Sequence, residues 1–283
     1  MRLNADYCRY RDGDWSLWVL REKWTAELWP VVLALIEKQP ASRHPQTLQI
    51  NKPGATVGEP LFLKVFHVSS AIGAFKDIFR NSKALRSLRQ TTTLAQLNFN
   101  VPTPVAVGEQ RQCRLLRKAF VLTMTVKGQS LPAFLKQNGA DLGSAEKRRG
   151  LQQLALEVRR LHQLGFVHGD LVPTNIFVSR VSGQGERFFF MDNDRTRHYA
   201  AWIPHGLWRR NLVQLNRIPL PGITLQDRVR FLSYYLGSKQ WGKKERRLLA
   251  WLERKTRERR KDCDSANESQ SFRRLMRWPG ELK

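Results

Sequence analysis

The order of polar residues between positions 161 and 195 limits what this chain can fold into more than any other feature. A segment with helical spacing of apolar residues ends at Gly165 and is followed by His168-Gly169-Asp170. Four residues separate Asp170 from Asn175, and an apolar run follows. After a turn rich in serine and glycine, a second apolar run ends in Asp192. This order predicts a helix, a polar loop and a β-hairpin whose end returns to the loop.

Phosphoryl transfer gives this spacing a chemical reason. A hydroxyl group must lose its proton as it attacks a phosphate, and the carboxylate of Asp170 is suited to orient that hydroxyl. A nucleoside triphosphate arrives with Mg²⁺, which prefers oxygen ligands such as Asn175 and Asp192 offer. Each residue alone has a plainer interpretation, because Asp170 could be a turn residue and Asn175 could cap a strand. The joint pattern favours phosphoryl transfer over these interpretations.

The rest of the chain predicts strands first and helices later. Alternating or β-branched runs predict strands over residues 15–20, 46–50, 60–66, 101–107 and 119–125. Helical spacing predicts helices over residues 25–38, 74–97, 131–138 and 144–164. We therefore expect an α+β, two-lobed chain. Residues 1–127 would form an N-terminal lobe with an antiparallel sheet, one helix and an extension over 1–45. Residues 128–283 would form a mostly helical catalytic lobe with a basic tail.

The net charge is the unusual bulk property of the chain. It carries 49 Lys and Arg against 24 Asp and Glu, a formal charge of +25, which attracts polyanions such as nucleic acid, anionic lipid or phosphorylated sugars. The scattered Cys8, Cys113 and Cys263 form no metal-binding pattern and indicate a reducing, cytoplasmic compartment. The most apolar run, residues 28–36, is shorter than the ~20 residues that span a bilayer. Attachment to a membrane surface stays open.

The segment 161–195 resembles the catalytic core of protein-kinase-like folds, and its His-Gly-Asp form resembles small-molecule kinases such as aminoglycoside and choline kinases. The resemblance to the Kdo/WaaP lipopolysaccharide kinase family is closer. It rests on Asp192-Asn193-Asp194, on Leu63-Lys64-Val65 within a strand, and on Val101-Pro102-Thr103-Pro104. It covers about residues 47–255, including basic segments at 207–212 and 227–232.

This resemblance implies a protein-kinase-like fold and an ATP-dependent kinase that uses Mg²⁺ to phosphorylate a heptose or Kdo sugar of the lipopolysaccharide inner core. Asp170 would be the catalytic residue, Lys64 would reach the α- and β-phosphates, and Asn175 and Asp192 would bind the metal. The partner would be an anionic glycolipid at the cytoplasmic face of the inner membrane, with no dedicated nucleic acid partner. Cationic residues there contribute ~1 kcal/mol each at an anionic surface.

The chain departs from the kinase pattern where a helix glutamate normally pairs with the strand lysine. No acidic residue lies between Asp77 and Glu109, and Arg86 and Arg89 occupy the expected place. Either Asp77 substitutes from the start of the helix, or Lys64 is held in another way.

Further departures concern loops. The segment Gly54-Ala-Thr-Val-Gly58 is too degenerate for a phosphate cradle and predicts a plain hairpin turn. Asn193 replaces the usual aromatic residue after the metal-binding Asp. We expect a structural role for Asp194 and a backbone contact, with no role as general base, for His168.

Two other functions stay open at this point. A soluble aminoglycoside- or choline-like phosphotransferase fits the His-Gly-Asp form, although a basic surface suits a cationic acceptor poorly. A pseudokinase that binds polyanions through its basic face fits the absent helix glutamate, whereas Asp170, Asn175 and Asp192 oppose it.

Overall fold

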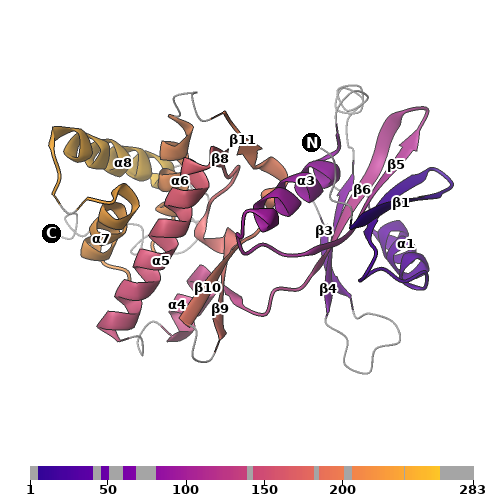
Figure 1. Ribbon diagram of the computed structural model, residues 1–283, viewed down its shortest axis with the longest axis horizontal. Coiled ribbons are helices and arrows are strands. Elements are labelled where there is room, and N and C mark those ends of the chain that lie inside the picture. The colour runs from indigo at the N-terminus through magenta and orange to yellow at the C-terminus, as the bar shows by residue number, and fades with distance from the viewer. Residues whose placement is uncertain are drawn as a thin grey trace. The chain divides into compact units, whose positions relative to one another are not determined.

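The computed structural model describes residues 6–40, 46–50, 60–67, 81–138, 143–181, 185–200, 206–238 and 240–261 (Figure 1). The chain divides into two compact units. The first holds Met1–Lys127 and Asp192–Arg195, and the second holds Gly128–Met191 and Thr196–Lys283. The segment 54–58, predicted as a hairpin turn, and Asp77 lie outside the described residues.

A six-stranded antiparallel sheet forms the centre of the first unit. Its strands are β1 (Tyr7–Asp12), β2 (Trp15–Leu20), β3 (Gln46–Ile50), β4 (Leu61–His67), β5 (Pro104–Gln112) and β6 (Leu115–Met124). Their order across the sheet is β1-β2-β5-β6-β4-β3. Strands β3 and β4 pair with Ile50 opposite Leu61, as the predicted hairpin requires.

Among the described helices, one packs on each face of this sheet, because apolar side chains alternate along its strands. Leu61, Leu63 and Val65 of β4 pack in one core with α1 (Leu28–Lys38). Phe66 of β4 packs in the opposite core with α3 (Lys83–Gln96). Helices α1 and α3 are seen on the two sides of the sheet (Figure 1). The even positions of β4, which include Lys64, therefore lie on the α3 face.

Strand β5 differs from its predicted range, because it runs from Pro104 to Gln112 and not over 101–107. Pro102 and Pro104 have no N–H group to donate to a ladder, so the strand starts at the second proline. The tight turn between β5 and β6 is formed by Cys113 and Arg114, whose φ angles are 48° and 66°. Neither residue type marks such a turn in a sequence, so the full length of this hairpin was not predicted.

The second unit is mostly helical and contains the predicted β-hairpin. Its helices are α4 (Leu131–Asn138), α5 (Ser144–Gln163), α6 (Leu207–Leu215), α7 (Leu225–Leu236) and α8 (Lys243–Lys261). Strands β9 (Ile176–Val181) and β10 (Gly185–Phe190) pair from Val181–Gly185 to Ile176–Phe190. Two-residue strands β7 (Gln129–Ser130), β8 (Phe166–Val167) and β11 (Arg197–His198) complete it. Helix α5 packs along α7.

Candidate active site

The polar loop starts at a position that only glycine can occupy. Gly165 has a φ of 80°, and a side chain there would lie 2.3 Å from the carbonyl oxygen of Tyr199. The Gly165 carbonyl in turn accepts a hydrogen bond of 2.8 Å from the Tyr199 amide. This close approach ends α5 and turns the chain into β8, which leads directly to His168.

His168 ties the loop to the end of the β-hairpin, as expected for a residue with a backbone contact. Its Nδ1 accepts from the amide of Asp170 at 3.1 Å, so its Nε2 carries the proton and donates to the Met191 carbonyl at 2.9 Å. The side chain is fully buried. His168 therefore has both ring nitrogens engaged in holding backbone and none left for proton transfer.

Asn175 lies beside Asp170, as the spacing predicts. A short helical turn, η1 (Pro173–Asn175), begins at a proline and returns the chain to the start of β9. Asn175 Nδ2 donates to the backbone carbonyl of Asp170 at 2.9 Å and lies 3.5 Å from its Oδ2. The Asn175 carbonyl accepts from the Met191 amide at 2.9 Å, so the residue before Asp192 is fixed at the loop.

Two amide side chains of α6 hold this loop from the other side, and sequence reasoning missed both. Asn211 is fully buried, accepts from the His168 amide at 3.0 Å and donates to its carbonyl at 2.6 Å. Gln214 donates to the Gly169 carbonyl at 3.3 Å and to Asp170 Oδ1 at 3.4 Å. Their spacing of one helical turn was visible in the sequence, but nothing there linked α6 to the loop.

In the first unit, Lys64 pairs with Asp192. The Nζ of Lys64 lies 2.5 Å from Asp192 Oδ1, and 18% of the lysine side chain is exposed. Asp192 has a φ of 57°, a left-handed conformation that non-glycine residues adopt at a cost of about 1–3 kcal/mol. Residues in such strained backbone conformations cluster at active sites and ligand-binding sites. Lys64 thus has a carboxylate partner although α3 contains no acidic residue.

A glutamate of β5 anchors the start of α3. Glu109 is buried, accepts from the Ser82 amide at 3.0 Å and accepts from Arg111 Nε at 3.0 Å. Ser82 caps α3 by accepting from the Leu85 amide. Glu109 therefore anchors the start of α3 from β5, while Asp192 is the partner of Lys64 and Arg86 stays exposed.

The helical turn η2 (Asn193–Arg195) follows Asp192 and packs against α3. Its Asp194 is buried at 7% exposure, which agrees with the expected structural role. Burial, and then the nearby Asp192, raise the pKa of Asp194 above its usual value, while Lys64, Arg195 and Lys83 oppose the rise. Asp192 and Asp194 therefore differ in environment, since Asp192 has the lysine partner.

Residues 68–235 match the lipopolysaccharide kinase (Kdo/WaaP) family, more than half of the chain. The chain belongs to this family. The matched range includes Asp170, Asn175 and Asp192, whereas Lys64 precedes it. Membership of a kinase family agrees with the interpretation of the loop as a phosphoryl-transfer site.

Two curated proteins are similar to parts of the chain. A 3-deoxy-D-manno-octulosonic acid kinase of Actinobacillus succinogenes is 28% identical over 140 residues, 48% of this chain and 53% of that protein. A Caenorhabditis elegans protein, whose name places it among the serine/threonine-protein kinases, is 33% identical over 91 residues, 31% of this chain and 26% of its own length. The chain thus spans about a quarter to about half of these relatives.

A solved structure of WaaP in complex with acyl carrier protein shares the fold. It aligns with a TM-score of 0.58 and 22% identity, covering 82% of this chain and 95% of WaaP. The predicted α+β, protein-kinase-like fold is thereby confirmed.

Each of the two predicted metal ligands, taken by itself, offers an oxygen of the type that Mg²⁺ prefers. The Oδ1 of Asn175 and the second oxygen of Asp192 have no hydrogen-bond partner within the described ranges. Mg²⁺ in phosphate-transfer sites takes one or two protein oxygens and completes its shell with phosphate and water. No cluster of three or more His, Cys, Asp or Glu side chains that could hold a metal occurs among the described residues.

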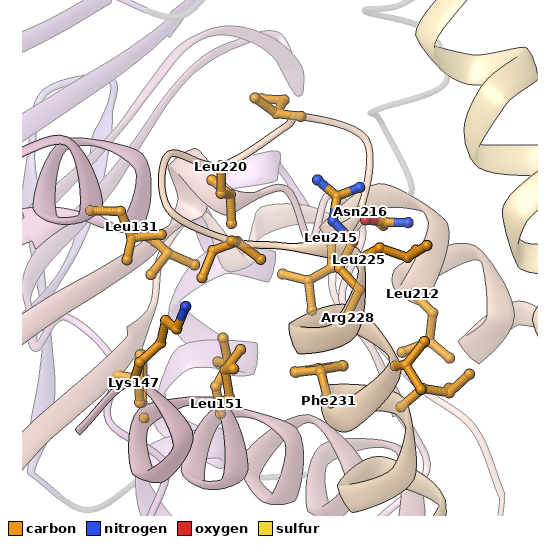
Figure 2. A pocket seen from close by; sticks show the side chains of 18 of the residues that line it. Leu131, Lys147, Leu151, Leu212, Leu215, Asn216, Leu220, Leu225, Arg228 and Phe231 are labelled. Atoms are coloured by element: carbon orange, nitrogen blue, oxygen red, sulfur yellow. The ribbon is translucent and has the colours of Figure 1, made fainter. Parts of the chain in front are cut away.

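The second unit contains an apolar pocket with a cavity volume of about 270 Å³ that the sequence did not reveal (Figure 2). Its wall draws on α4, α5, β10, α6, α7, α8 and the loop before α7, and is mostly aliphatic and aromatic. Lys147 lines it and is held by Asp227 at 3.0 Å and by the Gly222 carbonyl at 3.1 Å. A cavity with this lining suits an apolar ligand.

Proposed function

We propose that the chain is an ATP-dependent kinase that phosphorylates a sugar of the lipopolysaccharide inner core, a heptose or Kdo. The observation that carries the proposal is the way in which Asp170 is held. Its backbone and carboxylate are hydrogen-bonded by Asn175 and Gln214 within a loop that the family match covers. A loop without a catalytic role would not need two side chains to fix one carboxylate.

In the proposed reaction, the γ-phosphoryl group moves from ATP to a sugar hydroxyl oxygen and ADP leaves. Asp170 orients the hydroxyl and accepts its proton. Lys64 binds the phosphates from β4, and Asn175 and Asp192 are the proposed Mg²⁺ ligands. The cation, when bound, neutralises the charge that develops on the phosphates.

The pseudokinase alternative loses its main support, because Lys64 has a carboxylate partner in Asp192 without a helix glutamate. The small-molecule kinase alternative is tested by the acceptor. We expect phosphate on the core oligosaccharide and none on an aminoglycoside when both are offered with Mg²⁺ and ATP. Fragmentation by mass spectrometry would then assign the phosphate to heptose or Kdo. Phosphate on the aminoglycoside alone would contradict the proposal.

We also propose that the protein attaches to the cytoplasmic face of the inner membrane through α8. Its exposed cations are Lys243, Lys244, Arg246, Arg247, Arg254 and Arg259. The acidic Glu253 and Glu258 are already paired with Arg257 and Lys255. Within the described part of the chain, none of the helices has an apolar stretch of the length that a bilayer crossing requires.

A surface attachment of this kind predicts sedimentation with anionic vesicles that weakens as the salt concentration rises. Replacing Lys243, Lys244, Arg246 and Arg247 by serine should abolish sedimentation. Binding that is equal for neutral vesicles, or insensitive to salt, would contradict it.

A second proposed partner is an acyl carrier protein, whose acyl chain would enter the apolar cavity. WaaP, which shares the fold, was solved in complex with acyl carrier protein. Leu131, Leu151, Leu212 and Phe231 line the cavity and present only hydrocarbon to a ligand (Figure 2).

This assignment predicts co-elution with acyl carrier protein that bears a long acyl chain and loss of co-elution when Leu151→Trp fills the cavity. The exposed Leu156→Trp on the same helix is the matched control. If the unacylated carrier protein bound as well as the acylated one, or if the Leu151→Trp variant bound as well as the wild type, the cavity would have no role in binding the acyl chain.

A further inference from the structure

A continuous chain of hydrogen bonds leads from α7 to the carboxylate of Asp170. Tyr235 of α7 bonds to His162 Nδ1 of α5 at 2.8 Å, and His162 Nε2 bonds to Asn211 Oδ1 of α6 at 3.0 Å. Asn211 Nδ2 donates to Gln214 Oε1 at 2.9 Å. Gln214 Nε2 then reaches Asp170 Oδ1. Three helices are thus connected to the catalytic loop through polar side chains.

The donors and acceptors of this series of hydrogen bonds fit together in one arrangement only. Burial lowers the pKa of His162 to about 4, so its ring is neutral near pH 7, with one nitrogen accepting and the other donating. Asn211 Oδ1 already accepts from the His168 amide, so its Nδ2 must be the group that faces Gln214. Gln214 consequently presents Oε1 to Asn211 and to the Leu171 amide, and its NH₂ group faces Asp170.

We infer that Gln214 is a positioning residue for the reaction, which fixes the rotation of the Asp170 carboxylate through its NH₂ group. The inference rests on the proposed kinase function. Asn175 contacts Oδ2 of the same carboxylate, and Gln214 contacts Oδ1. With one side-chain amide on each oxygen, the carboxylate plane is held from both sides.

The direction of the amide separates this role from a purely structural one. The Oε1 of Gln214 serves the fold, because it accepts from Asn211 and from the Leu171 amide at 3.4 Å. The NH₂ group serves Asp170 and the Gly169 carbonyl. A glutamate at this position would keep the acceptor and lose the donor, and its charge would repel Asp170. A leucine would lose both without adding charge.

Positioning by the NH₂ group therefore predicts a rank order of kcat. Gln214→Leu should lower kcat about 100-fold, because a small misplacement of a reacting group costs that much. Gln214→Glu should lower it further, although it keeps the acceptor that the fold uses. The KM for ATP should change by less than about threefold in both variants. Both interrupt hydrogen bonds to Asp170, and the proposed function assigns Asp170 to the acceptor hydroxyl and not to ATP.

The matched control is Thr256→Val, which removes another buried hydrogen bond at the end of α6. Thr256 is fully buried and accepts from Asn216 Nδ2 at 3.3 Å, without contact to the loop. It should lower the melting temperature and leave kcat unchanged. Amide hydrogen exchange gives a readout without catalysis, because Gln214→Leu should speed exchange of the Leu171 amide and Thr256→Val should not.

The outcomes distinguish this inference from the proposed function. An active wild type in which Gln214→Glu has a higher kcat than Gln214→Leu would overturn the positioning role and leave the kinase intact. The positioning role would also be overturned if Thr256→Val lowered kcat as much as Gln214→Leu at an equal loss of melting temperature. A wild type that transfers no phosphate to any acceptor would overturn the proposed function and this inference with it.

Discussion

Replacing Asp170 by asparagine is expected to lower kcat about a thousandfold, because general-base catalysis contributes about 10²- to 10⁴-fold. The substitution keeps the size of the side chain and an oxygen that can accept from Asn175 or Gln214. Folding and the KM for ATP should therefore stay close to those of the wild type. Steady-state kinetics with a saturating acceptor, beside a thermal melt, would measure both.

The matched control for this variant is Asp14→Asn, an exposed carboxylate in the β1–β2 turn that has no part in the proposed site. It should leave kcat and KM unchanged. Wild-type kcat in Asp170→Asn would show that another group receives the proton, and the assignment of the catalytic residue would be wrong.

The second large effect is expected at Asp192. Asp192→Asn and Asp192→Ala should each reduce transfer to the background level, since they remove a proposed Mg²⁺ ligand and the carboxylate partner of Lys64. We expect a KM for Mg²⁺-ATP so high that the enzyme cannot be saturated, so that kcat cannot be measured. Calorimetric titration with Mg²⁺-ATP would show the loss of binding directly.

The two Asp192 variants also separate chemistry from folding. Asparagine tolerates the left-handed backbone at this position, whereas alanine is strained there by about 1 kcal/mol. Asp192→Asn should therefore melt near the wild-type temperature and Asp192→Ala below it, while both are inactive. Activity that follows the melting temperature across the pair would indicate a structural role for Asp192.

The local part of the candidate site could be predicted from the sequence because its residues are close along the chain. Asp170 and Asn175 are separated by one loop, and the β9–β10 hairpin brings the chain end at Met191 back to Asn175. Each of these steps has a recognisable signal in spacing and apolar runs. The roles of Asp170, Asn175, Asp192 and Lys64 stay predictions.

The supporting residues could not be predicted, because they lie far from the loop in sequence. Asn211 and Gln214 are 43 and 44 positions from the groups that they hold. Glu109 holds a helix cap 27 positions earlier in the chain. An Asn or Gln on an amphipathic helix is usually exposed, so burial of Asn211 was not evident before the helix was packed.

The absent helix glutamate shows why the kinase sequence pattern alone could not identify the partner of Lys64. The sequence left two possible partners for Lys64, Asp77 or another group, and Asp77 lies outside the described residues. Among the described residues, Lys64 is held by Asp192, and α3 is anchored by Glu109 from β5. A search for acidic residues on the helix alone could not find an anchor that lies on a neighbouring strand.

Transfer of the labelled γ-phosphate of ATP to dephosphorylated lipopolysaccharide core, with Mg²⁺ and with Asp192→Asn as the parallel sample, tests the central claim most directly. The proposed function predicts label in a core sugar with the wild type and none with the variant. Absence of label in the core, from a folded wild type that binds Mg²⁺-ATP, would contradict the assignment of this substrate. Equal label with both proteins would contradict the assignment of the site.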